Sequence, residues 1–146
     1  MIIELLKIDG TRHMLTVNRA DNTSASVTLD TKIYFLHDLC HYFVEQELNY
    51  KKGFWGMLAL GYGFTELTGK QNTLTEELRF IEKIVGPVQS IVSRHLPVEN
   101  FENSTAYLNS AITKNIPVKA VVTKIEECLK KWEGLNYGQR LILNYE

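Results

Sequence analysis

Two histidines and a glutamate recur at four-residue intervals in the first third of the chain. His37, His41 and Glu45 project from one side of a helix if this segment is helical. Imidazoles at positions i and i+4 have Cβ atoms about 5–6 Å apart and can bind one divalent ion. A carboxylate from the next turn completes three ligands and leaves a coordination position open for water. The spacing therefore predicts a metal site, with zinc as a suitable ion.

The same three residues also fit a structural role. They lie beside the apolar stripe of the expected helix, which comprises Leu36, Leu39, Cys40, Phe43 and Val44. The rim of a pocket lies at such a border, and so do ordinary half-buried histidines. Asp38 stands where the His-Glu-x-x-His zinc motif has its glutamate, is one methylene shorter, and could orient an imidazole. The sequence alone leaves both roles open.

Three classes of function follow from these residues. The favoured hypothesis is a noncatalytic binding or accessory domain for a small ligand or a protein, because two histidines and one acid lack a fourth catalytic component. The second is a hydrolase-like, divalent-metal-dependent enzyme, with His37 and His41 as ligands and Glu45 as third ligand or general base. The third is a homodimeric interaction module that uses a face or edge of a sheet left uncovered by helices.

Charge and hydropathy narrow the range of partners. The chain has 146 residues, with 16 basic and 17 acidic side chains, and no basic tract that would neutralise phosphates, so nucleic acid is not expected. The longest apolar run, 57–60, is too short to span a bilayer, and the opening residues do not have the pattern of a secretory leader. Cys40 and Cys128 are expected to be reduced. We expect one cytoplasmic domain over residues 1–146.

Strand patterns occur at both ends of the chain. Residues 2–8 are rich in aliphatic side chains, and Asp9-Gly10 after them is typical of a tight hairpin turn. Residues 12–18 and 25–29 alternate between apolar and polar side chains, which predicts two more strands of an antiparallel meander. Residues 139–145 alternate in the same way, so a final strand is expected to join the meander in one sheet.

Helical patterns fill the middle of the sequence. Helices are expected from about Leu36 to Asn49, over 54–67, over 104–113, and from Pro117 to Gly134. The longest helix is expected to begin at Thr73, with Glu76 completing a capping box, and to kink or break at Gly86-Pro87. Strands first, about five helices next and a strand last predict an α+β fold with helices packed against the sheet.

A longer motif surrounds the histidines. It consists of His37-Asp-Leu-Cys-His41, Val44-Glu45, and Gly53-Phe-Trp-Gly56 followed by Leu58-Ala59. This arrangement resembles a group of small bacterial proteins that have no assigned function, and the resemblance extends over most of the chain. It implies a shared α+β fold and a bacterial cytoplasmic protein, and it implies no activity.

Overall fold

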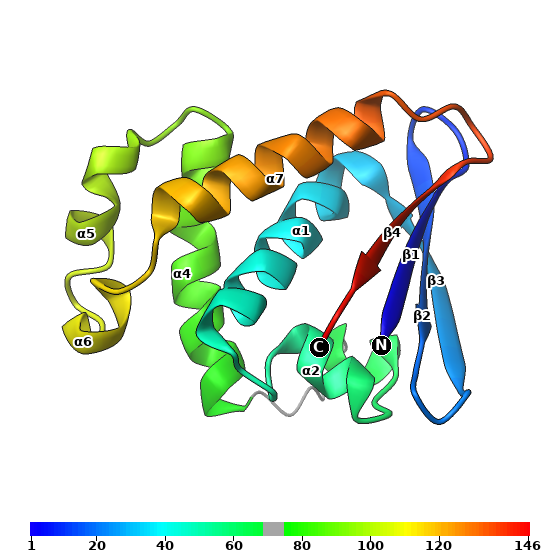
Figure 1. The fold of residues 1–146 in the computed structure, drawn as a ribbon, viewed down its shortest axis with the longest axis horizontal. Coiled ribbons are helices and arrows are strands. Elements are labelled where there is room, and N and C mark those ends of the chain that lie inside the picture. Colours follow the sequence, from blue (N-terminus) through cyan, green and yellow to red (C-terminus); the bar gives the residue numbers. More distant parts are fainter. Residues whose placement is uncertain (69–74) are drawn as a thin grey trace.

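A four-stranded antiparallel sheet is the base of the fold. The computed structural model describes residues 1–68 and 75–146 (Figure 1). The strands are β1 (Ile2–Lys7), β2 (Arg12–Asn18), β3 (Ser24–Asp30) and β4 (Arg140–Asn144). Their order is β3-β2-β1-β4, and β1 pairs with β2 on one side and with β4 on the other. The predicted meander and its junction with the final strand are therefore confirmed.

The side chain of Asp9 stabilises the turn between β1 and β2, where the sequence predicted a turn at Asp9-Gly10. Asp9 Oδ1 accepts hydrogen bonds from the backbone amides of Thr11 and Arg12, each at 2.8 Å. This pattern is the way in which aspartate stabilises a turn. It aligns β1 with β2 so that Leu5 lies opposite Leu15, and both side chains are buried on the inner face of the sheet.

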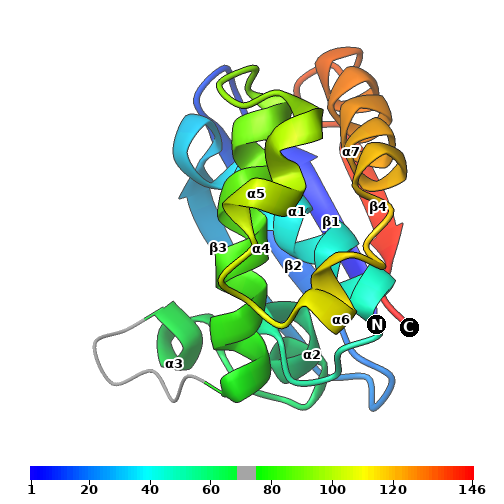
Figure 2. The same ribbon diagram turned by 90° about the vertical axis from the view of Figure 1, so that its left-hand side faces the viewer.

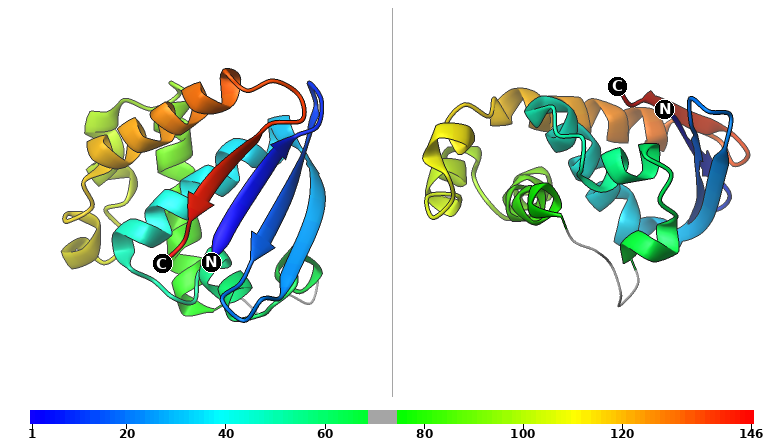
Figure 3. Two further views of the ribbon diagram at one scale, coloured as in Figure 1. Left: turned by 45° about the vertical axis from the view of Figure 1, so that its right-hand side comes forward. Right: turned by 90° about the horizontal axis from the view of Figure 1, so that it is seen from below.

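Helices cover one face of this sheet (Figure 3). They are α1 (Thr31–Leu48), α2 (Phe54–Ala59), α3 (Phe64–Thr68), α4 (Glu76–Val92), α5 (Phe101–Ser104), α6 (Ser110–Thr113) and α7 (Val118–Glu133), with a 3-10 turn, η1 (Val98–Asn100). The α+β fold class is confirmed. Figure 2 shows α1 between the sheet and α4.

Three helix boundaries differ from the sequence-based expectation. The first helix begins at Thr31, with Asp30 as its N-cap, because Asp30 accepts a hydrogen bond from the amide of Ile33. The stretch 54–67 forms two helices rather than one, since Gly61 between them has a φ of 104°, outside the helical region. The helix expected over 104–113 is also wrong, since only Ser104, the last residue of α5, and the four residues of α6 are helical there.

The helix that the sequence predicted to be the longest is α4, which has 17 residues, one fewer than α1. It runs through Pro87 without ending there, so the expected break is absent. The predicted cap Thr73 lies outside the described residues. In the structure Thr75 is the N-cap, and its hydroxyl accepts a hydrogen bond from the amide of Leu78 at 3.0 Å. A capping serine or threonine typically stabilises a helix by about 1 kcal/mol.

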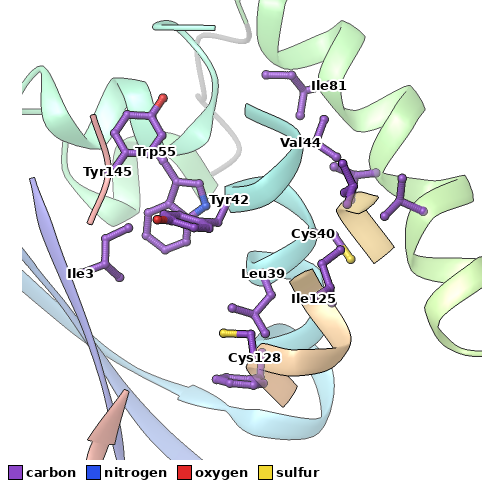
Figure 4. Close-up of a cluster of buried hydrophobic side chains, with 14 of the residues drawn as sticks. Ile3, Leu39, Cys40, Tyr42, Val44, Trp55, Ile81, Ile125, Cys128 and Tyr145 are labelled. Atoms are coloured by element: carbon purple, nitrogen blue, oxygen red, sulfur yellow. The ribbon is translucent and has the colours of Figure 1, made fainter. Parts of the chain in front are cut away.

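The core forms on two sides of α1. Towards the other helices, Cys40 and Val44 of α1 pack with Ile81 of α4 and Ile125 of α7 (Figure 4). Leu39 of α1 lies in the same core, which also includes Leu5 and Leu15 of the sheet. Both cysteines are free and buried. In the part of the chain that the structure describes, no helix is both long enough and apolar enough to cross a bilayer.

Candidate metal centre and adjoining cavity

Three ligand-type side chains meet where α1 passes α4. His37 and His41 of α1 and Glu82 of α4 each offer one ligand atom, and these atoms lie within 4.8 Å of one another. The closest contact joins Nε2 of His41 to Oε1 of Glu82 at 3.1 Å. Glu82 reaches this position because it follows Ile81, whose side chain fills the interface between the two helices. Its own side chain is 47% exposed, so the group lies near the surface.

The sequence-predicted Glu45 lies on the other side of the His41 ring. Oε1 of Glu45 faces Nδ1 of His41 at 3.5 Å, and within the described residues neither atom has a hydrogen-bond partner. Oε2 of Glu45 accepts hydrogen bonds from the backbone amides of Trp55 and Gly56, at 3.0 and 3.3 Å, and from the hydroxyl of Tyr145 at 3.3 Å. The carboxylate is fully buried. Its hydrogen bonds to the two amides connect α1 to the first turn of α2.

Gly53 leaves the space that this carboxylate needs. A Cβ atom at Gly53 would lie 2.3 Å from Cδ of Glu45 and 2.6 Å from Cδ1 of Ile81, both closer than atoms can approach. Gly53 is the N-cap residue of α2 and has extended backbone angles that any residue could adopt. The glycine is therefore required by the close approach of Glu45 and not by its own conformation.

Two carboxylates determine the charge of His41. Burial by itself would lower the pKa of this histidine, but the contacts with Glu45 and Glu82 outweigh burial and raise the pKa to about 9. The hydrogen bond with His41 lowers the pKa of Glu82 in turn, against the effect of burial. At neutral pH, His41 is thus an imidazolium held between two carboxylates.

The second histidine is oriented by an amide. Nδ1 of His37 lies 3.1 Å from Oε1 of Gln89, which is located on α4 two turns beyond Glu82. Because an amide oxygen only accepts, Nδ1 of His37 is the donor in this contact. The His37 ring packs edge-on against the His41 ring, with centroids 4.7 Å apart.

A cavity of about 220 Å³ adjoins the three ligand-type residues. Its apolar lining comes from the sheet and from α2, α3 and α4, and includes Leu15, Val27, Leu29, Phe54, Phe64 and Leu78. Its charged and imidazole groups are His37, Asp38 and His41 of α1 and Glu82 of α4. The cavity thus has a largely apolar wall and one polar wall, which is typical of small-molecule sites.

Asp38 is the most unusual group in this wall. The residue is only 7% exposed, and its Oδ2 atom has no hydrogen-bond partner among the residues that the structure describes. Burial raises the pKa of Asp38 to about 7, and the nearby His41 opposes that shift. A buried carboxyl oxygen without a partner costs free energy, which a ligand that pairs with it would recover.

The sequence-predicted site residues are therefore separated into two groups. His37 and His41 join in one cluster as the spacing predicted, whereas Glu45 lies behind His41 with one oxygen occupied by α2 and Tyr145. Sequence reasoning missed Glu82 and Gln89, which come from another helix. The only signal that could have indicated Glu82 was its place directly after Ile81, beside the apolar seam of α4.

No family model matches the chain, and no curated protein and no solved structure matches it either.

Proposed function

We propose that the protein is a divalent-metal-binding domain in which His37, His41 and Glu82 hold one zinc ion. The observation that carries this proposal is the approach of their three ligand atoms to within 4.8 Å. Two imidazoles and one carboxylate are a usual ligand set for zinc, and three protein ligands leave a fourth position open.

The distances support a zinc-sized ion. Two ligand atoms bound to one tetrahedral zinc at about 2.0–2.2 Å lie roughly 3.3–3.5 Å apart. The 3.1 Å between Nε2 of His41 and Oε1 of Glu82 is close to this separation. A zinc ion there would take the place of the proton that the two atoms share, while small side-chain rotations would bring His37 into range.

Contacts behind the ligands support the same assignment. Histidines that bind metals almost always donate their other ring N–H to a carboxylate or carbonyl oxygen. In this protein Nδ1 of His41 faces Glu45 and Nδ1 of His37 contacts Gln89. Both Nε2 atoms are then available for one ion. We therefore assign Glu45 as a positioning residue rather than as a third ligand or a general base, because it does not line the cavity.

Metal content tests this proposal. Protein purified without tag or chelator is expected to contain about one zinc per chain by mass spectrometry, and the His37→Ala/His41→Ala double variant almost none. Glu82→Gln is expected to lower zinc affinity strongly, and Glu45→Gln by roughly 10–100-fold, because it only orients His41.

Two matched controls accompany these variants. His95→Ala removes a histidine outside the cluster, and Glu47→Gln changes an acid two residues beyond Glu45 on the same helix; both should keep full zinc content. Equal zinc content in the wild-type protein and in the folded double variant would contradict the proposal.

A further inference from the structure

The size of the cavity beside the proposed metal centre defines how large a ligand can be. A dry protein cavity of about 150 Å³ accommodates benzene. The 220 Å³ here therefore encloses one six-membered ring and a few further atoms of a ligand. The aromatic residues Phe54 and Phe64 provide flat surfaces for such a ring.

The cavity is accessible from solvent. Most of its apolar lining is buried, with Leu15 at 0% and Leu78 at 4% exposure. Tyr34 and Glu82 also line it, and their exposed fractions are 42% and 47%, so the cavity reaches the surface beside the metal ligands. A ligand can enter with its apolar body towards Leu15 and its polar head towards the histidines.

Two features define the head group. Asp38 lines the cavity, and its Oδ2 atom is buried without a partner among the described residues, so a hydrogen-bonding group that reaches this oxygen would satisfy it. The proposed zinc ion would have one open position, which requires a lone pair. A hydroxyl group meets both requirements, because its oxygen can bind the ion while the O–H donates to Asp38. A methyl group meets neither, and a deprotonated carboxylate cannot donate.

We infer that the cavity binds a small neutral molecule with a ring-sized apolar body and one hydroxyl head, held between the metal ion and Asp38. The inference rests on the proposed zinc site for one of its two head-group contacts. It assigns Asp38 as a ligand-binding residue. A purely structural role for this buried aspartate would not predict any contact with a ligand.

Binding of model compounds to the zinc-loaded protein tests the inference. Benzyl alcohol, toluene and benzoate share one ring and differ in the head group. In nuclear magnetic resonance titrations, benzyl alcohol is expected to bind about tenfold more tightly than toluene or benzoate, because it alone pairs with both Asp38 and the ion. Its shifts should be largest for Val27, Leu29 and Phe64.

Three variants locate the binding. Val27→Phe fills the cavity from the edge strand β3 and should weaken benzyl alcohol binding about tenfold, with zinc content unchanged. Thr28→Phe adds the same ring to the opposite face of that strand, where residue 28 is exposed, and should have no effect. Asp38→Asn should reduce the preference for benzyl alcohol over toluene while zinc stays bound.

The experiment distinguishes a failure of the zinc site from a failure of the ligand site, because zinc is measured in each sample before any compound is added. Full zinc content with no preference for benzyl alcohol over toluene would overturn the inference and leave the metal site intact. Equal binding by Val27→Phe and wild type would overturn the location. Absence of zinc would overturn the proposed function, and with it the metal contact of the hydroxyl head.

Discussion

At the scale of the residue, His13 shows how the protein accommodates a histidine that has no role in the cluster. It is fully buried in β2, its Nδ1 contacts the hydroxyl of Thr31 at 3.1 Å, and its ring packs edge-on against Phe35 and Trp132. Burial lowers its pKa to about 4, and the Asp30 carboxylate only partly opposes this shift. His13 is therefore neutral in the folded protein.

This lowered pKa makes stability depend on pH. The unfolded chain binds a proton at His13 near pH 6.5, whereas the folded protein does so only near pH 4. Neutral His13 contributes fully to the free energy of unfolding above pH 6.5. As the pH falls from 6.5 to 5, protonation of the unfolded chain lowers the free energy of unfolding by about 2 kcal/mol. His13→Gln should remove this part of the pH dependence in urea unfolding series.

The comparison variant for that series is His95→Gln, since His95 lies outside the core. It should retain the wild-type slope of unfolding free energy against pH. Identical slopes for His13→Gln and the wild type would contradict a neutral buried His13.

At the scale of the element, α2 depends on a carboxylate from α1. Glu45 contacts the amides of the first turn of α2, and Gly53 provides the space. A six-residue helix is too short to be stable by itself, so this cap and its packing must hold it. The segment is helical because of its surroundings more than because of its own sequence.

Gly53→Ala tests this dependence. The added Cβ would displace Glu45 or Ile81, and overpacking of this kind lowers the free energy of unfolding by about 1–3 kcal/mol. Gly134→Ala is the matched change, because a Cβ there meets only ordinary contacts, with the nearest atom at 3.6 Å. It should raise stability by about 0.4–1 kcal/mol. Urea denaturation measures both, and equal effects would contradict the role of Gly53.

The elements were more predictable than the contacts between them. Alternation in 12–18 and the Asp9-Gly10 turn depend on neighbouring residues only, so the meander could be predicted from the sequence. The spacing of His37 and His41 is also local, and their meeting was predicted. Glu82 could not be, because its position depends on how α4 packs on α1. Similarly, the sequence did not reveal that Gly61 adopts a positive φ and divides one expected helix into two.

At the scale of the whole molecule, the proposed zinc ion would connect α1 to α4. Any ion that binds only the folded state stabilises it, by about 2.7 kcal/mol when its free concentration is 100 times Kd. Zinc should therefore raise the unfolding midpoint of the wild-type protein, and a chelator should reverse the change. The His37→Ala/His41→Ala variant provides the control, and an equal shift in both proteins would place the zinc elsewhere.

Among residues 1–68 and 75–146, no helix lies over the outer face of the sheet (Figure 3). Ile2 and Ile142 on this face are 45% and 55% exposed. That this face or a sheet edge forms a homodimer stays a prediction. Measuring the oligomeric state in solution would test it.

The pairing of β1 with β4 has a consequence for the protein during its synthesis. Ile3 pairs with Leu143, so β1 emerges from the ribosome long before the strand that will cover its edge. At roughly 5–20 residues per second, that edge stays open for about 7 to 28 seconds. An unpaired edge can pair with another chain. The nascent protein is thus most open to misassembly in the interval before β4 is made, and slower translation would lengthen that interval.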